Sequence, residues 1–81
     1  MVFETLNKLK WTGKLEKAEI VFVHRGAEGD KKIISGKNIT DIKRSHFYYK
    51  DNEHETHIPN HRVLEIRMGG KVLWKKRTSK G

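Results

Sequence analysis

VLEIRMGGKVLWK, residues 63–75, is the stretch that decides how this chain folds. Two short apolar runs flank a central Gly-Gly pair, which strongly favours a β-hairpin because the tight turn needs positive φ angles. With a two-residue loop, Ile66 faces Leu73 and Glu65 faces Trp74, whereas a three-residue loop would shift this pairing. The sequence therefore predicts an antiparallel hairpin at the end of the domain.

Four more short strands are expected upstream of this hairpin, where β-branched and aromatic residues gather between turn signals. The strongest runs are residues 19–24 and 45–50, and shorter runs occupy residues 32–35 and 55–58. Residues 39–44 fit either a strand or a turn of helix. Glycine, asparagine and aspartate mark the connections between these segments.

The N-terminal segment has the periodicity of a helix. Apolar residues from Val2 to Leu9 recur at three- and four-residue steps, which predicts a helix over residues 2–11 with one buried face. Gly13 suits the C-terminal cap, and Trp11 is expected to close the core at this end. The sequence thus predicts an α+β domain, in which one N-terminal helix packs on a mostly antiparallel sheet of five or six short strands that ends in the hairpin.

The chain has 81 residues, which is enough for one domain with one thin hydrophobic core. We assign residues 1–76 to this domain and expect residues 77–81 to form a disordered basic tail. The sequence has no cysteine, which excludes disulfides, thiolate metal sites and cysteine nucleophiles. It has no apolar run of about 20 residues and no signal-peptide core, so we expect a cytoplasmic protein with no membrane partner.

Positive charge is concentrated in the last quarter of the chain. The formal net charge is +8, and residues 61–81 hold seven Lys or Arg residues against one acidic residue. Such a patch favours a polyanionic partner, nucleic acid before an anionic membrane, although a solubilising tail has the same composition. We interpret the basic hairpin and tail as a source of sequence-independent attraction to a nucleic-acid backbone.

Two predicted turns carry residues suited to binding a phosphate. After the strand 19–24, Arg25 can clamp two oxygens, and Gly26 lets backbone amides approach an anion closely. Before the hairpin, Pro59 fixes the direction of the chain, which then presents His61 and Arg62. In both cases the alternative is an ordinary solvated turn.

Three consecutive aromatic residues alternate across the predicted strand 45–50. Phe47 and Tyr49 share one face, and Tyr48 lies on the other. One face is expected to join the core, and a ring on the other face offers a surface on which an RNA base can stack. The alternative is that all three rings are half-buried in packing.

Five histidines suggest a metal site or acid–base catalysis, but their spacing supports neither. Pro59 prevents a helix that would align His57 with His61, and no carboxylate stands at a companion spacing, so we expect no metal and no cofactor. Acid–base chemistry on RNA would use two histidines that move protons near neutral pH. Phosphoesterases with His-x-Ser/Thr motifs need two copies, and the sequence has one, at His54. We assign no catalytic residue and favour a binding module over an enzyme.

Four segments together resemble one family of small archaeal proteins, the RNA cyclic-group end recognition domain. They are LNKLKW at residues 6–11, VHRG at residues 23–26, IPNHRV at residues 58–63 and GKVLW at residues 70–74. The resemblance runs from about Phe3 to Lys76 and implies recognition of RNA ends that bear a 2′,3′-cyclic phosphate. Relatives in which the domain is attached to RNA ligase-like, nucleotidyltransferase-like and phosphoesterase proteins imply RNA-repair or RNA-processing partners.

We therefore predict a non-enzymatic RNA-binding module, in which the turns at residues 24–26 and 59–62 meet at one edge of the sheet and form a basic pocket. The predicted phosphate- and RNA-binding residues are His24, Arg25, Gly26, Arg44, Tyr49, His61 and Arg62. The resemblance supplies those in the two turns, and the residue pattern adds Arg44 and Tyr49. Two alternatives stay open: a small RNA-processing enzyme that uses histidine acid–base chemistry, and a protein-interaction adaptor.

Overall fold

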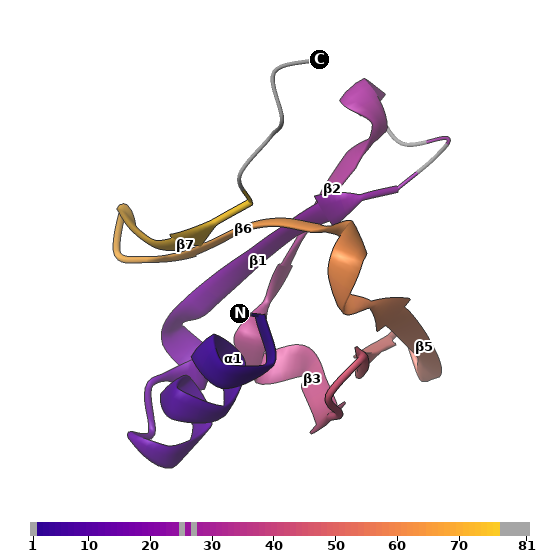
Figure 1. Ribbon diagram of the computed structural model, residues 1–81. Helices are drawn as coiled ribbons and strands as arrows, with labels where there is room; N and C mark the ends of the chain where they lie inside the picture. Colours follow the sequence, from indigo (N-terminus) through magenta and orange to yellow (C-terminus); the bar gives the residue numbers. More distant parts are fainter. Residues whose placement is uncertain (1, 25, 27, 77–81) are drawn as a thin grey trace.

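One α-helix and seven short strands, joined by turns and short 3₁₀ segments, make up the part of the chain that the structure describes (Figure 1). The structure is a computed structural model that describes residues 2–24, 26 and 28–76. In chain order the elements are α1 (Val2–Trp11), η1 (Leu15–Lys17), β1 (Ala18–Val23), η2 (Glu28–Asp30), β2 (Lys31–Ser35), η3 (Gly36–Asn38), β3 (Ile39–Ile42), β4 (His46–Asp51), β5 (His54–Pro59), η4 (Asn60–Arg62), β6 (Val63–Met68) and β7 (Lys71–Lys75). None of the helices in these residues is long and apolar enough to cross a membrane.

The strands pair into two antiparallel sheets, with the order β2-β1-β6-β7 in the larger sheet and β3-β4-β5 in the smaller one. The predicted α+β class with antiparallel strands is confirmed, but the strands divide between two sheets where one was expected. Residues 39–42, which the sequence left undecided, form β3 and pair with β4. The chain thus passes from the larger sheet to the smaller one at η3 and returns at η4.

Apolar side chains from the helix and from both sheets form one core. Leu6 of α1 and Ile20 of β1 are fully buried there. Phe22 of β1 packs edge-on against Phe47 of β4, with ring centroids 6.5 Å apart, and so joins the two sheets. Full burial of one such side chain stabilises a fold by about 1.5–3 kcal/mol, so this contact helps to fix the two sheets against each other.

The final hairpin forms as predicted, but its register was predicted wrongly because the hairpin contains a β-bulge. Ile66 pairs with Trp74 rather than with Leu73, and Glu65 pairs with Lys75 rather than with Trp74. A bulge adds one residue to a strand and so shifts every later pair by one. Directly opposed residues point to the same side of a sheet, so the shift places Trp74 on the face of buried Ile66. There Trp74 is half-buried and packs against the core.

The helix forms over the predicted residues, and Gly13 ends it as expected. Gly13 has a φ angle of 72°, which glycine adopts without strain. The Gly13 amide donates to the Lys10 carbonyl oxygen at 3.2 Å, and the Lys14 amide donates to the Leu9 carbonyl oxygen at 2.9 Å. These two bonds form a Schellman motif, which satisfies carbonyl groups that the helix end would otherwise leave unpaired.

Trp11 does not close the core as expected, because 84% of this residue is exposed. The buried stripe of α1 consists of Val2, Leu6 and Leu9. With 3.6 residues per turn, Trp11 lies about 200° around the helix from Leu9. The expectation was wrong because this rotation turns the indole away from the buried stripe.

Replacing Trp11 by phenylalanine is expected to change the free energy of unfolding by less than about 0.5 kcal/mol, because so little of the residue is buried. Thermal unfolding followed by circular dichroism measures this effect. A fall in melting temperature of more than about 4 °C would show instead that the indole packs against the domain.

Candidate nucleic-acid interface

The end of β1 and the turn η4 lie side by side at one end of the larger sheet. β1 and β6 are antiparallel and Phe22 pairs with Val63, so the residues after Phe22 lie beside those before Val63. A hollow of about 370 Å³ at this place is lined by Val23, His61, Arg62 and Lys76. The hollow joins the end of the first strand to the turn that carries the predicted His-Arg pair.

The lining of this hollow is basic. His61 and Arg62 are exposed, and the Lys76 Nζ donates a hydrogen bond to the His61 carbonyl oxygen at 2.7 Å. None of the four lining residues is acidic, and within the described residues no carboxylate forms an ion pair with Arg62. The Arg62 guanidinium can therefore offer two parallel N–H donors to an anion.

Asn60 fastens the loop between β3 and β4 to η4. Its Nδ2 donates to the carbonyl oxygens of Arg44 at 2.9 Å and Lys43 at 3.4 Å, and its backbone amide donates to the Ser45 carbonyl oxygen at 2.8 Å. Lys43 hydrogen-bonds to Asp41, and this bond holds the pKa of the Asp41 carboxyl below its usual value. Arg44 is exposed and forms no ion pair within the described chain, and the bond to its carbonyl oxygen holds its backbone beside η4.

The turn after β1 is described in part. Gly26 has a φ angle of 92°, and open space surrounds the place where a Cβ would lie. His24 is half-buried with its ring 6.2 Å from the Phe22 ring, and its amide donates to the Asp30 carbonyl oxygen at 2.9 Å. This hydrogen bond closes the loop that carries Gly26. Arg25 lies outside the described residues, so its approach to Arg62 stays a prediction.

Residues 2–76, nearly the whole 81-residue chain, match the model of a family described as the MJ1316 RNA cyclic group end recognition domain. The chain belongs to this family. This match confirms the resemblance drawn from the sequence motifs.

Several archaeal proteins of the UPF0248 group are similar to this member of the family. The protein from Methanocaldococcus jannaschii is 43% identical over an alignment that covers 95% of each chain. A protein from Methanococcus maripaludis is 42% identical and covers 95% of this chain and 100% of its own. One from Pyrobaculum aerophilum is 36% identical and covers 91% of this chain and 96% of its own. No solved structure matches the chain significantly.

Lys76 is a basic lining residue that the sequence did not place in the site. The sequence analysis gave the basic hairpin and tail only a sequence-independent attraction to the RNA backbone. The Lys76 amide donates to the Leu64 carbonyl oxygen at 2.8 Å, so the end of the hairpin returns to the start of β6, beside η4. The predicted hairpin already contained this signal. An antiparallel pair brings residues equally distant from its turn together, and Lys76 is about as far from the turn as η4 is.

Tyr49 is a core residue in this family member. Only 3% of Tyr49 is exposed. The centroid of the Tyr49 ring lies 5.8 Å from that of the Phe22 ring and 5.6 Å from the Lys32 Nζ. The buried ring therefore offers no free face on which an RNA base could stack. The predicted alternation is confirmed, since Phe47 is also buried and Tyr48 is half-buried on the opposite face.

On that opposite face, three rings contact one another. The ring centroids of His46 and Tyr48 are 5.2 Å apart, those of Tyr48 and His57 are 5.9 Å apart, and those of the two histidines are 5.6 Å apart. Residues 2–24, 26 and 28–76 contain no group of three metal-ligating side chains that could hold an ion. None of these rings lines the basic hollow beside η4.

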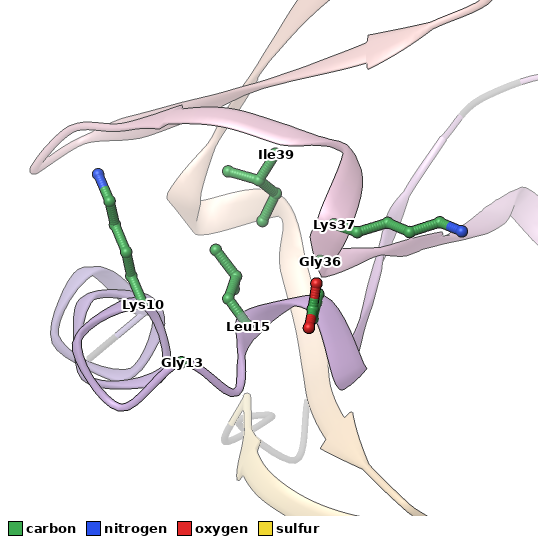
Figure 2. A pocket seen from close by; sticks show the side chains of 7 residues that line it. Lys10, Gly13, Leu15, Gly36, Lys37 and Ile39 are labelled. Carbon is green, nitrogen blue, oxygen red and sulfur yellow. The ribbon is translucent and has the colours of Figure 1, made fainter.

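A second hollow, of about 360 Å³, lies where the helix end and η1 meet η3 (Figure 2). It is lined by Lys10, Gly13, Leu15, Glu16, Gly36, Lys37 and Ile39. Figure 2 shows the Lys10 and Lys37 side chains extending to opposite sides, so their ammonium groups do not converge on one anion. Glu16 also adds a negative charge to the lining. This hollow therefore suits a phosphate less well than the one beside η4.

Proposed function

We propose that this protein binds RNA and that the basic hollow beside η4 holds the phosphate group at an RNA end. The observation that carries the proposal is the convergence of His61, Arg62 and Lys76 on one hollow whose lining has no acidic residue. The description of the family, recognition of RNA cyclic groups, points to the same class of ligand.

The three basic residues have different parts in this proposal. Arg62 donates two parallel hydrogen bonds to phosphate oxygens, which fixes the orientation of the group. His61 donates one hydrogen bond from its ring, and Lys76, held by the His61 carbonyl oxygen, adds a positive charge close by. Together they neutralise the charge that distinguishes a phosphorylated end from a hydroxyl end.

The end of β1 and the β3–β4 loop complete the proposed site. Gly26 lets backbone amides approach the anion, and Arg25 adds a second guanidinium. His24 either donates to an oxygen or sets the turn. Arg44 attracts the preceding phosphates of the strand, a contribution that falls as salt concentration rises.

Three labelled oligonucleotides of one sequence, with 2′,3′-cyclic phosphate, 3′-phosphate or 3′-hydroxyl ends, test the proposal by fluorescence anisotropy. We expect both phosphorylated ends to bind at least about tenfold more tightly than the hydroxyl end, because a hydrogen bond to a charged group contributes about 1.5–3 kcal/mol. Equal affinities for all three ends would remove the claim of end recognition.

Analysis of the RNA after incubation separates a binding module from the alternatives. We expect the cyclic phosphate to be recovered intact. Ring opening that is lost in the His61→Ala or His24→Ala variant would identify an RNA-processing enzyme instead. Failure to bind any of the three oligonucleotides at moderate salt would favour an adaptor for RNA-repair or RNA-processing proteins.

A further inference from the structure

A smaller hollow adjoins the proposed phosphate site. It has a volume of about 280 Å³ and is lined by Val2, Asn60, His61, Val63, Trp74 and Lys76. His61 and Lys76 line both hollows, so the two are neighbours on either side of these residues. Connected parts of one ligand can therefore occupy both hollows.

The two hollows differ in chemistry. The surface of the smaller hollow is almost entirely apolar, with Val2, Val63 and Trp74 among its walls. Trp74 belongs to this wall because the β-bulge of the final hairpin turns it to the face of Ile66. A phosphate gains nothing from such walls, whereas a flat aromatic group buries its faces there.

The side-chain oxygen of Asn60, one of the lining residues, is buried without a hydrogen-bond donor in the described part of the chain. The Asn60 Nδ2 is committed to the Arg44 and Lys43 carbonyl oxygens, which fixes the orientation of the amide. The Asn60 Oδ1 is buried and accepts no hydrogen bond within the described chain. A buried acceptor without a donor is costly, and because solvent does not reach this atom, a ligand N–H can meet it only after Asn60 or its neighbours shift.

We propose that the smaller hollow is a base subsite, which holds the nucleobase of the terminal nucleotide while its phosphate occupies the larger hollow. The inference rests on the proposed function, because the phosphate brings the base to this place. A nucleobase has flat apolar faces that suit the wall formed by Trp74, and its phosphate lies close enough to reach the neighbouring basic hollow. The domain then recognises a nucleotide at the RNA end rather than an isolated phosphate.

The ligand-side test leaves the protein unchanged. Two oligonucleotides with a 3′-phosphate are compared by anisotropy, one with an intact terminal nucleotide and one in which the terminal ribose lacks its base. We expect removal of the terminal base to weaken binding about tenfold, which is typical of losing one base–aromatic contact. A third oligonucleotide, abasic five positions from the end, is the control and should bind as the intact one does.

The outcomes separate the two proposals. Equal affinity of the intact and terminally abasic oligonucleotides, with the preference for a phosphorylated end retained, overturns the base subsite and leaves the phosphate site standing. Loss of that preference for a phosphorylated end overturns both. A similar loss of affinity at both abasic positions shows general stacking along the strand and also overturns a subsite for the terminal base.

A fluorescence measurement reports on the subsite directly. The sequence contains two tryptophans, so Trp74 is the single emitter in the Trp11→Phe variant. We expect the intact oligonucleotide at saturation to quench Trp74 emission by stacking, and the terminally abasic one to leave the emission nearly unchanged. The same spectrum with both ligands would overturn the proposal. In the Trp74→Phe variant, exposed Trp11 is the emitter and should show no difference between the two oligonucleotides.

Discussion

Replacing Arg62 by alanine is expected to weaken the binding of RNA with a phosphorylated end by about 10- to 100-fold. Arg62 lines the basic hollow and forms no ion pair within the described residues, so the guanidinium donors are available to the proposed anion. The range corresponds to about 1.5–3 kcal/mol, the contribution of a single hydrogen bond to a charged group, because water replaces part of the bidentate contact at this exposed site. Anisotropy titrations with the 3′-phosphate and 3′-hydroxyl oligonucleotides measure it.

The matched control is Lys71→Ala, which removes the same unit of charge at the opposite end of β6. Lys71 is exposed and pairs with Met68 beside the hairpin turn, whereas Arg62 directly precedes β6. General attraction to the RNA backbone predicts a similar, small loss in both variants. A specific site predicts that only Arg62→Ala abolishes the preference for a phosphorylated end. Equal losses in the two variants would contradict the site.

Much of the fold followed from short-range patterns in the sequence. The stripe of Val2, Leu6 and Leu9 predicted α1, and the Gly-Gly pair predicted the final hairpin, because both signals depend on residues close together in the chain. The pairing of β1 with β6 is different in kind, since its partners, from Phe22 with Val63 to Ala18 with Met68, are 41 to 50 residues apart in the chain. Without that pairing, the sequence offered the approach of the two turns only as a hypothesis.

Most of the remaining errors arose where tertiary contacts decide the outcome. The sequence gives no sign of the bulge that moves Trp74 to the core side. Trp11 is a different case, because the helical phase set by Val2, Leu6 and Leu9 already turns it away from the core. Tyr49 and Tyr48 could be assigned to opposite faces from their alternation, but which face is buried depends on Phe22 of a different sheet. For the same reason Asn60, whose contacts reach the β3–β4 loop, carried no signal in the sequence.

Gly36→Ala is expected to destabilise the domain by about 3 kcal/mol, at the upper end of the usual cost of overpacking. Gly36 is buried at the start of η3, and a Cβ built on it would overlap the Leu15 carbonyl oxygen and lie 3.0 Å from the Leu15 carbonyl carbon. Both residues line the hollow of Figure 2. Because the obstacle is backbone, a change of rotamer cannot relieve it. For a domain of this size the melting temperature should fall by more than about 10 °C.

The position of Gly36 between the two sheets limits how far the backbone can shift to make room for an added methyl group. η3 joins β2 of the larger sheet to β3 of the smaller one, so a displacement at Gly36 moves one sheet against the other. Ser35 holds the turn by accepting a hydrogen bond from the Lys37 amide and donating one to the Glu16 carbonyl oxygen. Lys37→Ala, an exposed substitution in the same turn, is the control and should melt within about 3 °C of the unchanged protein. If Gly36→Ala melts as Lys37→Ala does, the close approach of η1 and η3 does not hold the two sheets together.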